Sequence, residues 1–316
     1  MKSSRSRVVW VQAKPVSGSL DAGSPEELRP LLEAGLLELT GCQDVASAWS
    51  RYFTSSDTIA LKVNCLGGPS MCTHPALAKA VAQSLRSIRV PPQQIIVWDR
   101  STRELDRCGF DVNPRRNDQV RCFGTDQRGA GYEEELTIQG SVGSLYSTIL
   151  TRQATAAINM PILKDHGLCG LTGALKNIFG ALHNPNKYHE NRCNPYIADA
   201  NAVPFVREKN RLVIFDALRV QYKGGPSFHS QWVENLGSLL LAEDPVAVDS
   251  VAARILDKIR GQKGLPPIEP DGALPAYIRT AADSDRKLGR CRPEEIDLVE
   301  KVVTVQRPVQ GEPGTG

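Results

Sequence analysis

Short runs of branched, apolar residues alternate with longer helix-like stretches, and this alternation constrains the fold more than any other feature. The strand-like runs occupy residues 8–11, 58–63, 94–98, 154–159, 211–215 and 236–241. Helix-like stretches cover residues 74–88 and follow probable N-caps at Ser24 and Asp244. Strands that alternate with helices predict an α/β fold, with a mostly parallel sheet and helices on both faces.

The length allows one large hydrophobic core. We expect a single large α/β domain over residues 1–307, either compact or divided into two lobes with a cleft between them. A turn-rich segment at residues 308–316 is expected to be a flexible tail. The 38 basic and 35 acidic residues leave a net charge of +3, which is too balanced for a nucleic-acid-binding surface.

The apolar runs are short. None approaches the roughly 18 apolar residues of a membrane-spanning helix. The basic start of the chain precedes an apolar run at residues 8–11, which is shorter than the ~7–15 apolar residues of a secretory signal. We therefore expect no membrane partner and a cytoplasmic location for the chain as given.

The eight cysteines are scattered, and no two of them form a CxxC pair. Structural zinc sites and ferredoxin-type clusters normally need closely spaced cysteines. We therefore expect reduced thiols and no iron–sulfur cluster in this chain.

Polar residues stand where four of the expected strands end. Lys62 and Asn64, Asp99, Asn159 and Asp216 each follow a different strand-like run. Ligands of open α/β sheets bind beyond the carboxyl ends of the strands. The sequence therefore predicts a functional rim at this edge of the sheet.

The segment at residues 160–189 is the most informative part of this rim. His166 follows Lys164, and Gly170 and Gly173 precede a helix that we expect to begin near Thr172. Glycines allow close approach of backbone N–H groups to a ligand, and a helix N-terminus favours an anion. Lys176 and Asn177, in the first turn of the expected helix, complete a predicted cofactor or anion site with Lys164 and the two glycines.

Helical geometry would place Lys176, Gly180 and His183 on one face, with Gly180 leaving an empty step for a ligand between the other two. The opposite stripe is apolar and should face the core; it comprises Leu171, Leu175, Ile178, Phe179 and Leu182. The alternative is that the glycines serve helix packing, Lys176 is solvated and His183 interacts with the helix dipole. Three of the five histidines lie within residues 166–189, which favours the functional interpretation.

Two further candidates lie outside this segment. His74 stands at an expected helix start, where it is either a site residue or an ordinary loop residue. Asp244 is sufficiently explained as a helix cap, so Asp249 is the better functional candidate of that acidic pair.

Several segments together form a specific pattern: LKVNCLGG, THPAL, NMPILKDHG, GLTGALKNIFG, HNPNKYH, the GGP turn and DPVAVD. Over about residues 62–260 this pattern resembles the family called "domain of unknown function 362". The resemblance implies no particular activity. Some family members carry a ferredoxin-like segment or a twin-arginine signal, and neither pattern is present here.

A more distant resemblance connects the site motif with nickel-pincer lactate racemases. His166, the Gly-Leu-Thr-Gly segment and Lys176 resemble their histidine, Gly-rich segment and the lysine that holds the pincer nucleotide covalently. The resemblance implies a lactate-racemase-like site layout, with His74 as acid/base and His183 or His189 as the further histidine. The chain departs from that pattern, because the arginine of their Thr-His-Arg-Pro element is missing and Phe179-Gly180 replaces a proline.

Three hypotheses follow. The first is an isomerase-, racemase- or oxidoreductase-like enzyme that transfers a proton or hydride on a small carboxylate with nickel, zinc or a nickel-pincer-like nucleotide. In it His74, His166 and Lys176 are catalytic, and His166 with His183 or His189 binds the metal. The second is a metal-free enzyme that binds a small anionic substrate at the Gly-rich loop and Lys176, with a histidine as general base. The third is a non-catalytic carrier or sensor of a metal or nucleotide.

Overall fold

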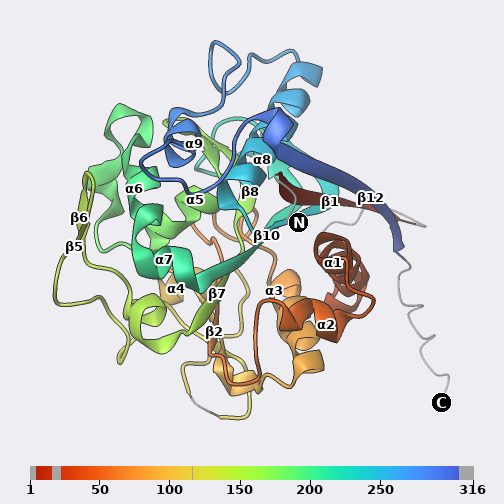
Figure 1. Cartoon of the computed structure of the whole chain (residues 1–316), viewed down its shortest axis with the longest axis vertical. Coiled ribbons are helices and arrows are strands. Elements are labelled where there is room, and N and C mark those ends of the chain that lie inside the picture. Colours follow the sequence, from red (N-terminus) through yellow and green to blue (C-terminus); the bar gives the residue numbers. More distant parts are fainter. Residues whose placement is uncertain (1–4, 16–22, 116, 306–316) are drawn as a thin grey trace.

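The computed structural model describes residues 5–15, 23–115 and 117–305, and Figure 1 shows their arrangement. The tail expected at residues 308–316 lies outside the described residues. Within the described chain, ten strands form one mixed sheet, and β5 (Thr137–Gln139) and β6 (Val142–Ser144) form a separate hairpin.

The large sheet is mostly parallel, as the alternation of strands and helices predicts. Its strands lie in the order β12 (Ile296–Val305), β1 (Ser6–Pro15), β11 (Val233–Ala242), β10 (Asn210–Gln221), β7 (Ala156–Asn159), β2 (Ile59–Lys62), β3 (Ile95–Trp98) and β4 (Arg121–Cys122). Strand β8 (Ile162–His166) pairs with β10 and with β9 (Gly170–Thr172). The pairs from β10 through β7, β2 and β3 to β4 are parallel, whereas β11 is antiparallel to both of its neighbours. All six expected strands are therefore present in an α/β fold.

Helices cover both faces of the sheet. The helices α1 (Pro25–Thr40), α2 (Val45–Ser50) and α3 (Pro75–Ser84) lie on one face, and the other face carries α5 (Ala174–Asn177), α6 (Tyr196–Ala202), α7 (Pro204–Lys209), α8 (Pro245–Gln262) and α9 (Ala276–Ala281) (Figure 1). Successive residues of β1 enter different cores, because side chains alternate across a strand: Val9 packs under α1, and Trp10 packs under α8. The two cores confirm the expected covering of both faces.

The expected helix starts are confirmed. Ser24 caps α1 in a capping box with Glu27, whose side chain accepts a hydrogen bond from the Ser24 N–H. Gly41 ends that helix in a left-handed conformation, with a φ of 69°. Asp244 caps α8 by accepting hydrogen bonds from the N–H groups of Val246 and Ala247.

The prediction of one continuous helix from Thr172 to His183 is wrong. Thr172 ends strand β9, α5 covers only Ala174–Asn177, and a 3₁₀ turn follows at Ile178–Ala181. The chain leaves the helical path because its backbone pairs elsewhere: the Ala181 carbonyl accepts the Ser147 N–H, and the His183 N–H donates to the Leu145 carbonyl. These long-range hydrogen bonds compete with continuation of the helix.

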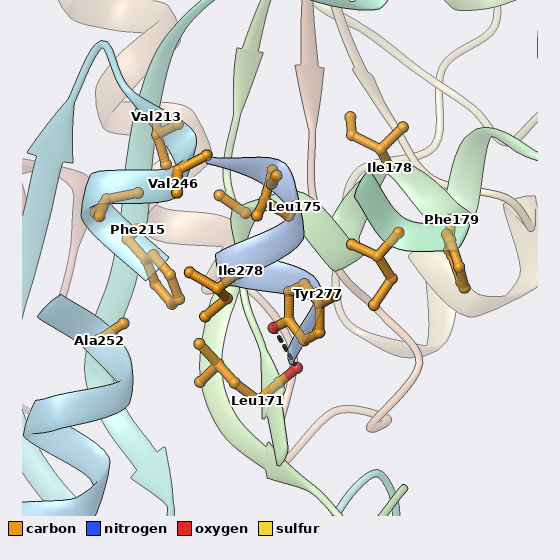
Figure 2. Packing of buried hydrophobic residues seen from close by; sticks show 14 of the residues in the cluster. Leu171, Leu175, Ile178, Phe179, Val213, Phe215, Val246, Ala252, Tyr277 and Ile278 are labelled. Atoms are coloured by element: carbon orange, nitrogen blue, oxygen red, sulfur yellow. Dashed lines mark hydrogen bonds between the residues drawn. The ribbon is translucent and has the colours of Figure 1, made fainter. Parts of the chain in front are cut away.

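The apolar residues of that segment are nevertheless buried. Leu171 and Leu175 pack into the core near Phe215 and Ile278, and Ile178 and Phe179 lie farther along the same core (Figure 2). Tyr277 of α9 donates its hydroxyl to the Leu171 carbonyl at 3.1 Å (Figure 2). The predicted apolar stripe therefore faces the core, although it follows a strand, one helical turn and a 3₁₀ turn.

In the part of the chain that the structure describes, no helix combines the length and apolar character needed to cross a bilayer.

The Asp244 carboxylate joins three distant parts of the chain and yields a stability prediction. Besides capping α8, it accepts hydrogen bonds from the Ser6 hydroxyl at 2.6 Å and the Arg290 N–H at 2.9 Å. Replacement Asp244→Ala should therefore lower the free energy of unfolding by about 2 kcal/mol, measured by urea denaturation. Asp44→Ala is the matched control, since Asp44 caps only the short helix α2 through an exposed hydrogen bond to Ser47. An equal loss in both variants would contradict the linking role of Asp244.

Candidate functional site

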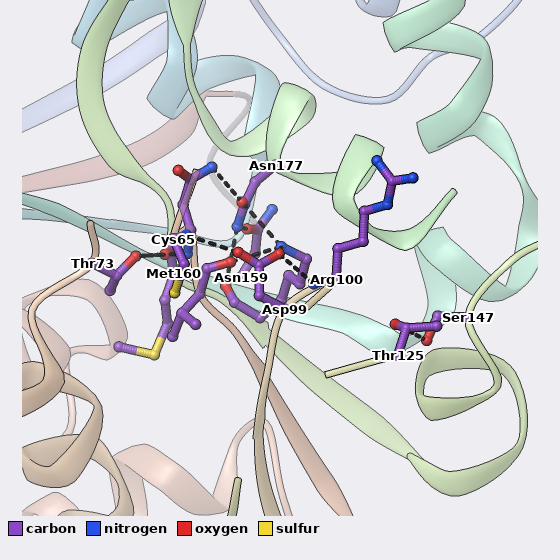
Figure 3. Close-up of polar contacts among 12 residues, drawn as sticks. Cys65, Thr73, Asp99, Arg100, Thr125, Ser147, Asn159, Met160 and Asn177 are labelled. Carbon is purple, nitrogen blue, oxygen red and sulfur yellow. Dashed lines mark hydrogen bonds and ion pairs between the residues drawn. The ribbon is translucent and has the colours of Figure 1, made fainter. Parts of the chain in front are cut away.

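The polar residues predicted at the strand ends converge on one edge of the sheet. Lys62 of β2 donates through Nζ to Asp99 Oδ1, just after β3, at 2.7 Å, and both side chains are buried. Asp99 Oδ2 also accepts the Cys65 N–H at 2.8 Å (Figure 3). A buried ion pair needs further hydrogen bonds to its charged atoms, because a buried charge without partners raises the free energy of the folded state. The pair ties the ends of two neighbouring strands together.

Asn177 connects this ion pair to the Gly-rich segment. Its side-chain amide donates to the Lys62 carbonyl at 3.0 Å and to Asn159 Oδ1 at 2.8 Å (Figure 3). Its Oδ1 accepts from Lys62 Nζ at 3.3 Å and from Asn64 Nδ2 at 3.1 Å. The amide hydrogens of this predicted cofactor-binding residue are thus used within the protein, where they hold α5 against the ends of β2 and β7.

The Lys62–Asp99 ion pair occupies the space beside Gly180 that the sequence suggests for a ligand. A Cβ atom on Gly180 would lie 2.7 Å from Lys62 Nζ and 2.9 Å from Asp99 Oδ1. The interpretation of Gly180 as room for a ligand between Lys176 and His183 is therefore wrong. The missing side chain makes room for a lysine–aspartate pair of the protein itself.

The anion site expected at the start of α5 also has an internal occupant. Asp249 of α8 accepts the Ala174 N–H at 2.6 Å and the Leu175 N–H at 3.0 Å, and a Cβ on Gly173 would lie 2.4 Å from its Oδ1. Complete burial raises the pKa of Asp249 to about 7, against the two N–H donors, which lower it. Gly173 therefore accommodates an aspartate of the protein. The expectation of an external anion at this position is wrong.

Gly170 serves the turn between two strands. Its φ of 84° lies in the left-handed region, and it joins β8 to β9, where His166 faces Gly170 in the antiparallel ladder. A Cβ there would meet Pro275 at 3.1 Å and Glu269 at 3.2 Å. Gly170 thus shapes the hairpin that carries His166.

Lys164 is a buried cation close to the predicted rim. Its Nζ donates to Asn64 Oδ1 at 3.4 Å, and no solvent reaches the side chain. Burial lowers the pKa of Lys164 to about 8, although Asp99 nearby raises it. Its amine lies behind Gly67, on which a Cβ would come within 2.9 Å of Nζ.

A pocket of about 250 Å³ opens at that glycine. It is lined by Cys65, Leu66, Gly67, Gly68, Glu104, Arg107, Ser227 and Phe228. Burial raises the pKa of Glu104, which Asp99 raises further. Gly67, which has no side chain, therefore lies between this pocket and the Lys164 amine.

His166, Lys176 and His189 form the other part of the site. The rings of His166 and His189 stack with centroids 6.0 Å apart, and Lys176 Nζ lies 3.2 Å from His189 Nε2. Burial lowers the pKa of His166 to about 3, with further contributions from Lys176, His189 and Lys164. His166 is therefore neutral near pH 7, beside two lysines.

The hydrogen bonds assign the tautomers of both rings. His189 Nδ1 lies 3.0 Å from the Pro185 carbonyl, so Nδ1 carries the proton and Nε2 accepts from Lys176. His166 Nδ1 accepts the Leu168 N–H at 3.3 Å, so the proton of the neutral ring is on Nε2. Burial and Lys176 lower the pKa of His189 as well.

The structure brings His189, and not His183, to Lys176. His183 is exposed, and its ring packs edge-on against Tyr132 at 5.0 Å. The ending of α5 at Asn177 removes the helical face that would have aligned His183 with Lys176. The prediction of His183 as a ligand beside Lys176 is therefore wrong, because the helix that would align the two residues does not form.

His74 belongs to a separate dyad on the same edge of the sheet. Its Nδ1 lies 2.8 Å from Asp216 Oδ2, which also accepts the His74 backbone N–H at 2.7 Å. Arg219 lies 3.3 Å from His74 Nε2. The sequence places Asp216 at a strand end, which is wrong, because β10 continues to Gln221. Its carboxylate fixes His74 in one orientation with the proton on Nδ1.

Two of the scattered cysteines lie close to this part of the site, Cys193 beside Lys176 and Cys169 beside Leu171. Cys193 Sγ lies 4.0 Å from Lys176 Nζ, and the Cys169 thiol donates to the Leu171 carbonyl at 3.6 Å. No sequence motif marks the approach of Cys193 to Lys176. Over the described residues, no three His, Cys, Asp or Glu side chains are grouped so as to hold a metal ion.

Comparison with known proteins gives one sequence family. A family model described as "Domain of unknown function (DUF362)" matches residues 59–254. No curated protein matches the chain. A similar solved structure is the crystal structure of a structural genomics target from Thermotoga maritima, with 13% identity and a TM-score of 0.41. The alignment covers 75% of this chain and 60% of that one, so this chain spans less than two thirds of that protein's length.

The packing at Gly180 predicts a strong effect of one methyl group. Replacement Gly180→Ala should lower the free energy of unfolding by about 3 kcal/mol, because the new Cβ displaces the buried Lys62–Asp99 pair. Gly261→Ala in α8 is the control, since nothing lies within 4 Å of its Cβ position. Chemical denaturation measures both. Equal stability of Gly180→Ala and the wild type would show that the ion pair has room to move.

The depressed pKa of His166 predicts a loss of stability in acid. Because the folded chain protonates His166 only near pH 3, the unfolded chain binds a proton first as the pH falls below about 6.5. The His166 contribution should reduce the free energy of unfolding by about 3 kcal/mol between about pH 7 and pH 4. Denaturation at both pH values should show this loss reduced in His166→Gln. The exposed His183→Gln control should retain the full loss, and the same pH dependence in all three proteins would refute the burial effect.

Proposed function

The chain belongs to the family described as domain of unknown function DUF362, and we propose that it is an enzyme that binds a small carboxylate and transfers a proton on it. The proposed substrate site contains Lys164, Lys176 and His166, with His189 supporting Lys176. This is the metal-free form of the chemistry that the sequence suggests. The printed description of the family assigns no activity.

The observation that carries the proposal is the pair of buried lysines that lack carboxylate partners. In the described part of the chain, neither Lys164 nor Lys176 forms an ion pair, in contrast to Lys62, which pairs with Asp99. Lys164 makes one long hydrogen bond to an amide oxygen, and Lys176 contacts an imidazole and a thiol. Interior cations are stabilised by an anion in contact with them. A small carboxylate supplies that charge and accepts the unused N–H groups.

Three neighbouring side chains hold the Lys176 amine in the position proposed for anion binding. Its Nζ lies over the Phe179 ring at 4.5 Å, donates to His189 and contacts Cys193. Asp249 fixes the turn that precedes it by accepting the two N–H groups at the start of α5. A lysine with few alternative positions loses little conformational entropy when it binds an anion.

His166 is the proposed proton-transfer group. Its Nε2 carries the proton of the neutral ring and has no hydrogen-bond partner among the described residues. A neutral imidazole can donate this hydrogen bond to a substrate oxygen, and the adjacent ammonium groups stabilise negative charge that develops on the substrate. The His74–Asp216 dyad supplies a second oriented imidazole for proton transfer on the same edge of the sheet.

The metal-dependent alternative requires a different arrangement of these residues. Imidazole and thiolate suit nickel or zinc, and His166, His189 and Cys193 provide those donor types. Over the described residues these side chains do not form a three-ligand group. The residues present therefore do not fit the resident metal–nucleotide group, and we derive no step through it.

Removal of each lysine charge tests the proposal. Isothermal titration of the purified chain with acetate, lactate and inorganic phosphate should show that Lys164→Met and Lys176→Met each weaken binding of a carboxylate at least about tenfold. This is the effect of losing one charge-assisted hydrogen bond. Lys258→Met, which removes an exposed charge from α8, should bind as the wild type does.

The titration, together with metal and mass analysis of the same preparations, distinguishes the three hypotheses. Unchanged carboxylate affinity in both buried-lysine variants would refute the proposed site. Metal analysis and intact mass of the same preparations would support the metal-dependent alternative if they showed stoichiometric metal, or an adduct lost in Lys176→Met. Saturable binding without turnover of any small carboxylate would favour the carrier.

A further inference from the structure

Strand β12 forms one edge of the large sheet, and none of the described strands pairs with its outer side. It is ten residues long, whereas β4 at the opposite edge has two residues, of which Cys122 also pairs with Asn113. A long open edge presents backbone N–H and C=O groups that can pair with another strand. The outer edge of β12 is therefore a candidate docking surface for a further strand.

The side chains of β12 add apolar surface to this edge. Val302 is 64% exposed and Leu298 is 42% exposed, and both lie on the α8 side of the sheet, because side chains alternate along a strand and Ile296 packs in the core on that side. A groove of about 350 Å³ lies between β12 and α8, with Trp10 and Ile255 among the residues that line it. Helix α8 therefore leaves the outer part of β12 uncovered.

The other side of β12 carries a charge that is already paired. Lys301 Nζ lies 2.9 Å from Glu38 Oε2 of α1, and both side chains are partly exposed. Val299 and Val303 flank Lys301 on this side and pack against the core under α1. This side of the strand therefore brings a pair of opposite charges and two branched side chains to the edge.

We propose that β12 pairs antiparallel with β12 of a second copy of this chain, so that the two sheets become continuous across a two-fold axis. Such an axis, perpendicular to the sheet, keeps each face of the sheet on the same side. Residues directly opposite each other in an antiparallel pair also point to the same face. The axis must therefore pass between one residue of β12 and the same residue of the second copy.

The charges select Lys301 as the residue at the axis. Because β12 runs from residue 296 to residue 305, only Glu300 or Lys301 at the axis would pair nearly the whole strand. Glu300 forms no ion pair within the described chain and accepts a hydrogen bond from the neutral Gln12 amide at 3.3 Å, so two opposed Glu300 carboxylates would repel each other. Lys301 at the axis instead brings together two Lys301–Glu38 pairs, in which each ammonium already has its carboxylate.

The same register matches the remaining side chains. Val299 lies opposite Val303 of the second copy on the α1 side, and the axis repeats this pair of branched residues. On the α8 side, Val302 lies diagonal to Leu298 and Val302 of the second copy. The most exposed apolar side chains of β12 therefore gather at the interface. This inference does not depend on the proposed carboxylate site.

Size-exclusion chromatography with light scattering tests the dimer on the full chain. We expect the wild type to have twice the mass of one chain and to dissociate on dilution. Val302→Lys should raise the dissociation constant of the dimer at least about tenfold, because it places two ammonium groups at diagonal positions across the axis. Ile138→Lys is the matched control, since Ile138 is 75% exposed on the β5–β6 hairpin and this variant should dimerise as the wild type does.

Disulfide trapping tests the register. Lys301→Cys should form an interchain disulfide on mild oxidation, because the two introduced thiols lie opposite each other at the axis. Glu300→Cys is the control, since residue 300 lies opposite Val302 of the second copy and should give no more cross-linked dimer than the wild type. Non-reducing electrophoresis measures both variants against the wild-type background.

Three results would contradict the inference. A wild-type chain that stays monomeric at every concentration tested would overturn it and leave the edge to a strand of a different protein. A dimer that Val302→Lys does not weaken and Lys301→Cys does not trap would place the interface elsewhere on the molecule. Stronger trapping of Glu300→Cys than of Lys301→Cys would overturn the register and the charge argument that selects it.

Discussion

The buried ion pair between Lys62 and Asp99 is the constraint around which the rest of the site is arranged. It sits where β2 and β3 end, and its charges are satisfied by Asn177, by the Val63 carbonyl and by the Cys65 N–H. Such a pair is stable only when its remaining donors and acceptors are matched. Meeting that requirement fixes α5 against the sheet, and the position of α5 in turn places Lys176 beside His189.

The glycines of the central segment follow from the same requirement. Gly180 accommodates the Lys62–Asp99 pair, and Gly173 accommodates the Asp249 carboxylate. Gly225 makes room for Asp165: a Cβ there would meet the Asp165 carbonyl oxygen at 2.0 Å and Oδ1 at 2.7 Å, and Oδ1 accepts the Gly225 N–H at 2.7 Å. A Gly-rich sequence thus reflects internal charges that lie close to the backbone. An external phosphate or carboxylate is not needed to explain these positions.

Local sequence patterns predict much of the fold, because the strands and capped helices depend on neighbouring residues. Ser24 with Glu27 and the cap at Asp244 are examples, as is the gathering of Lys62, Asp99, Asn159 and Asp216 at one edge of the sheet. The path after Lys176 could not be predicted in this way. Helical periodicity aligned His183 with Lys176, but backbone pairing with residues 145–147 ends the helix, and His189 takes the place beside the lysine. The burial of Cys193 beside Lys176 depends on a run of left-handed backbone at residues 191–193, which no sequence pattern predicts.

The position of β1 has a consequence for how the chain reaches its native state. This strand lies between β11 and β12, so Val8 pairs with Ala242 and Ser6 with Ile296. Its partners are synthesised well after it, and contacts of such high sequence separation slow folding. The strands from β2 to β10 can assemble while β1 is still unpaired. Val9 and Val11 then have to stay out of non-native pairings until β11 and β12 have been synthesised, so this half of the sheet closes after the other half.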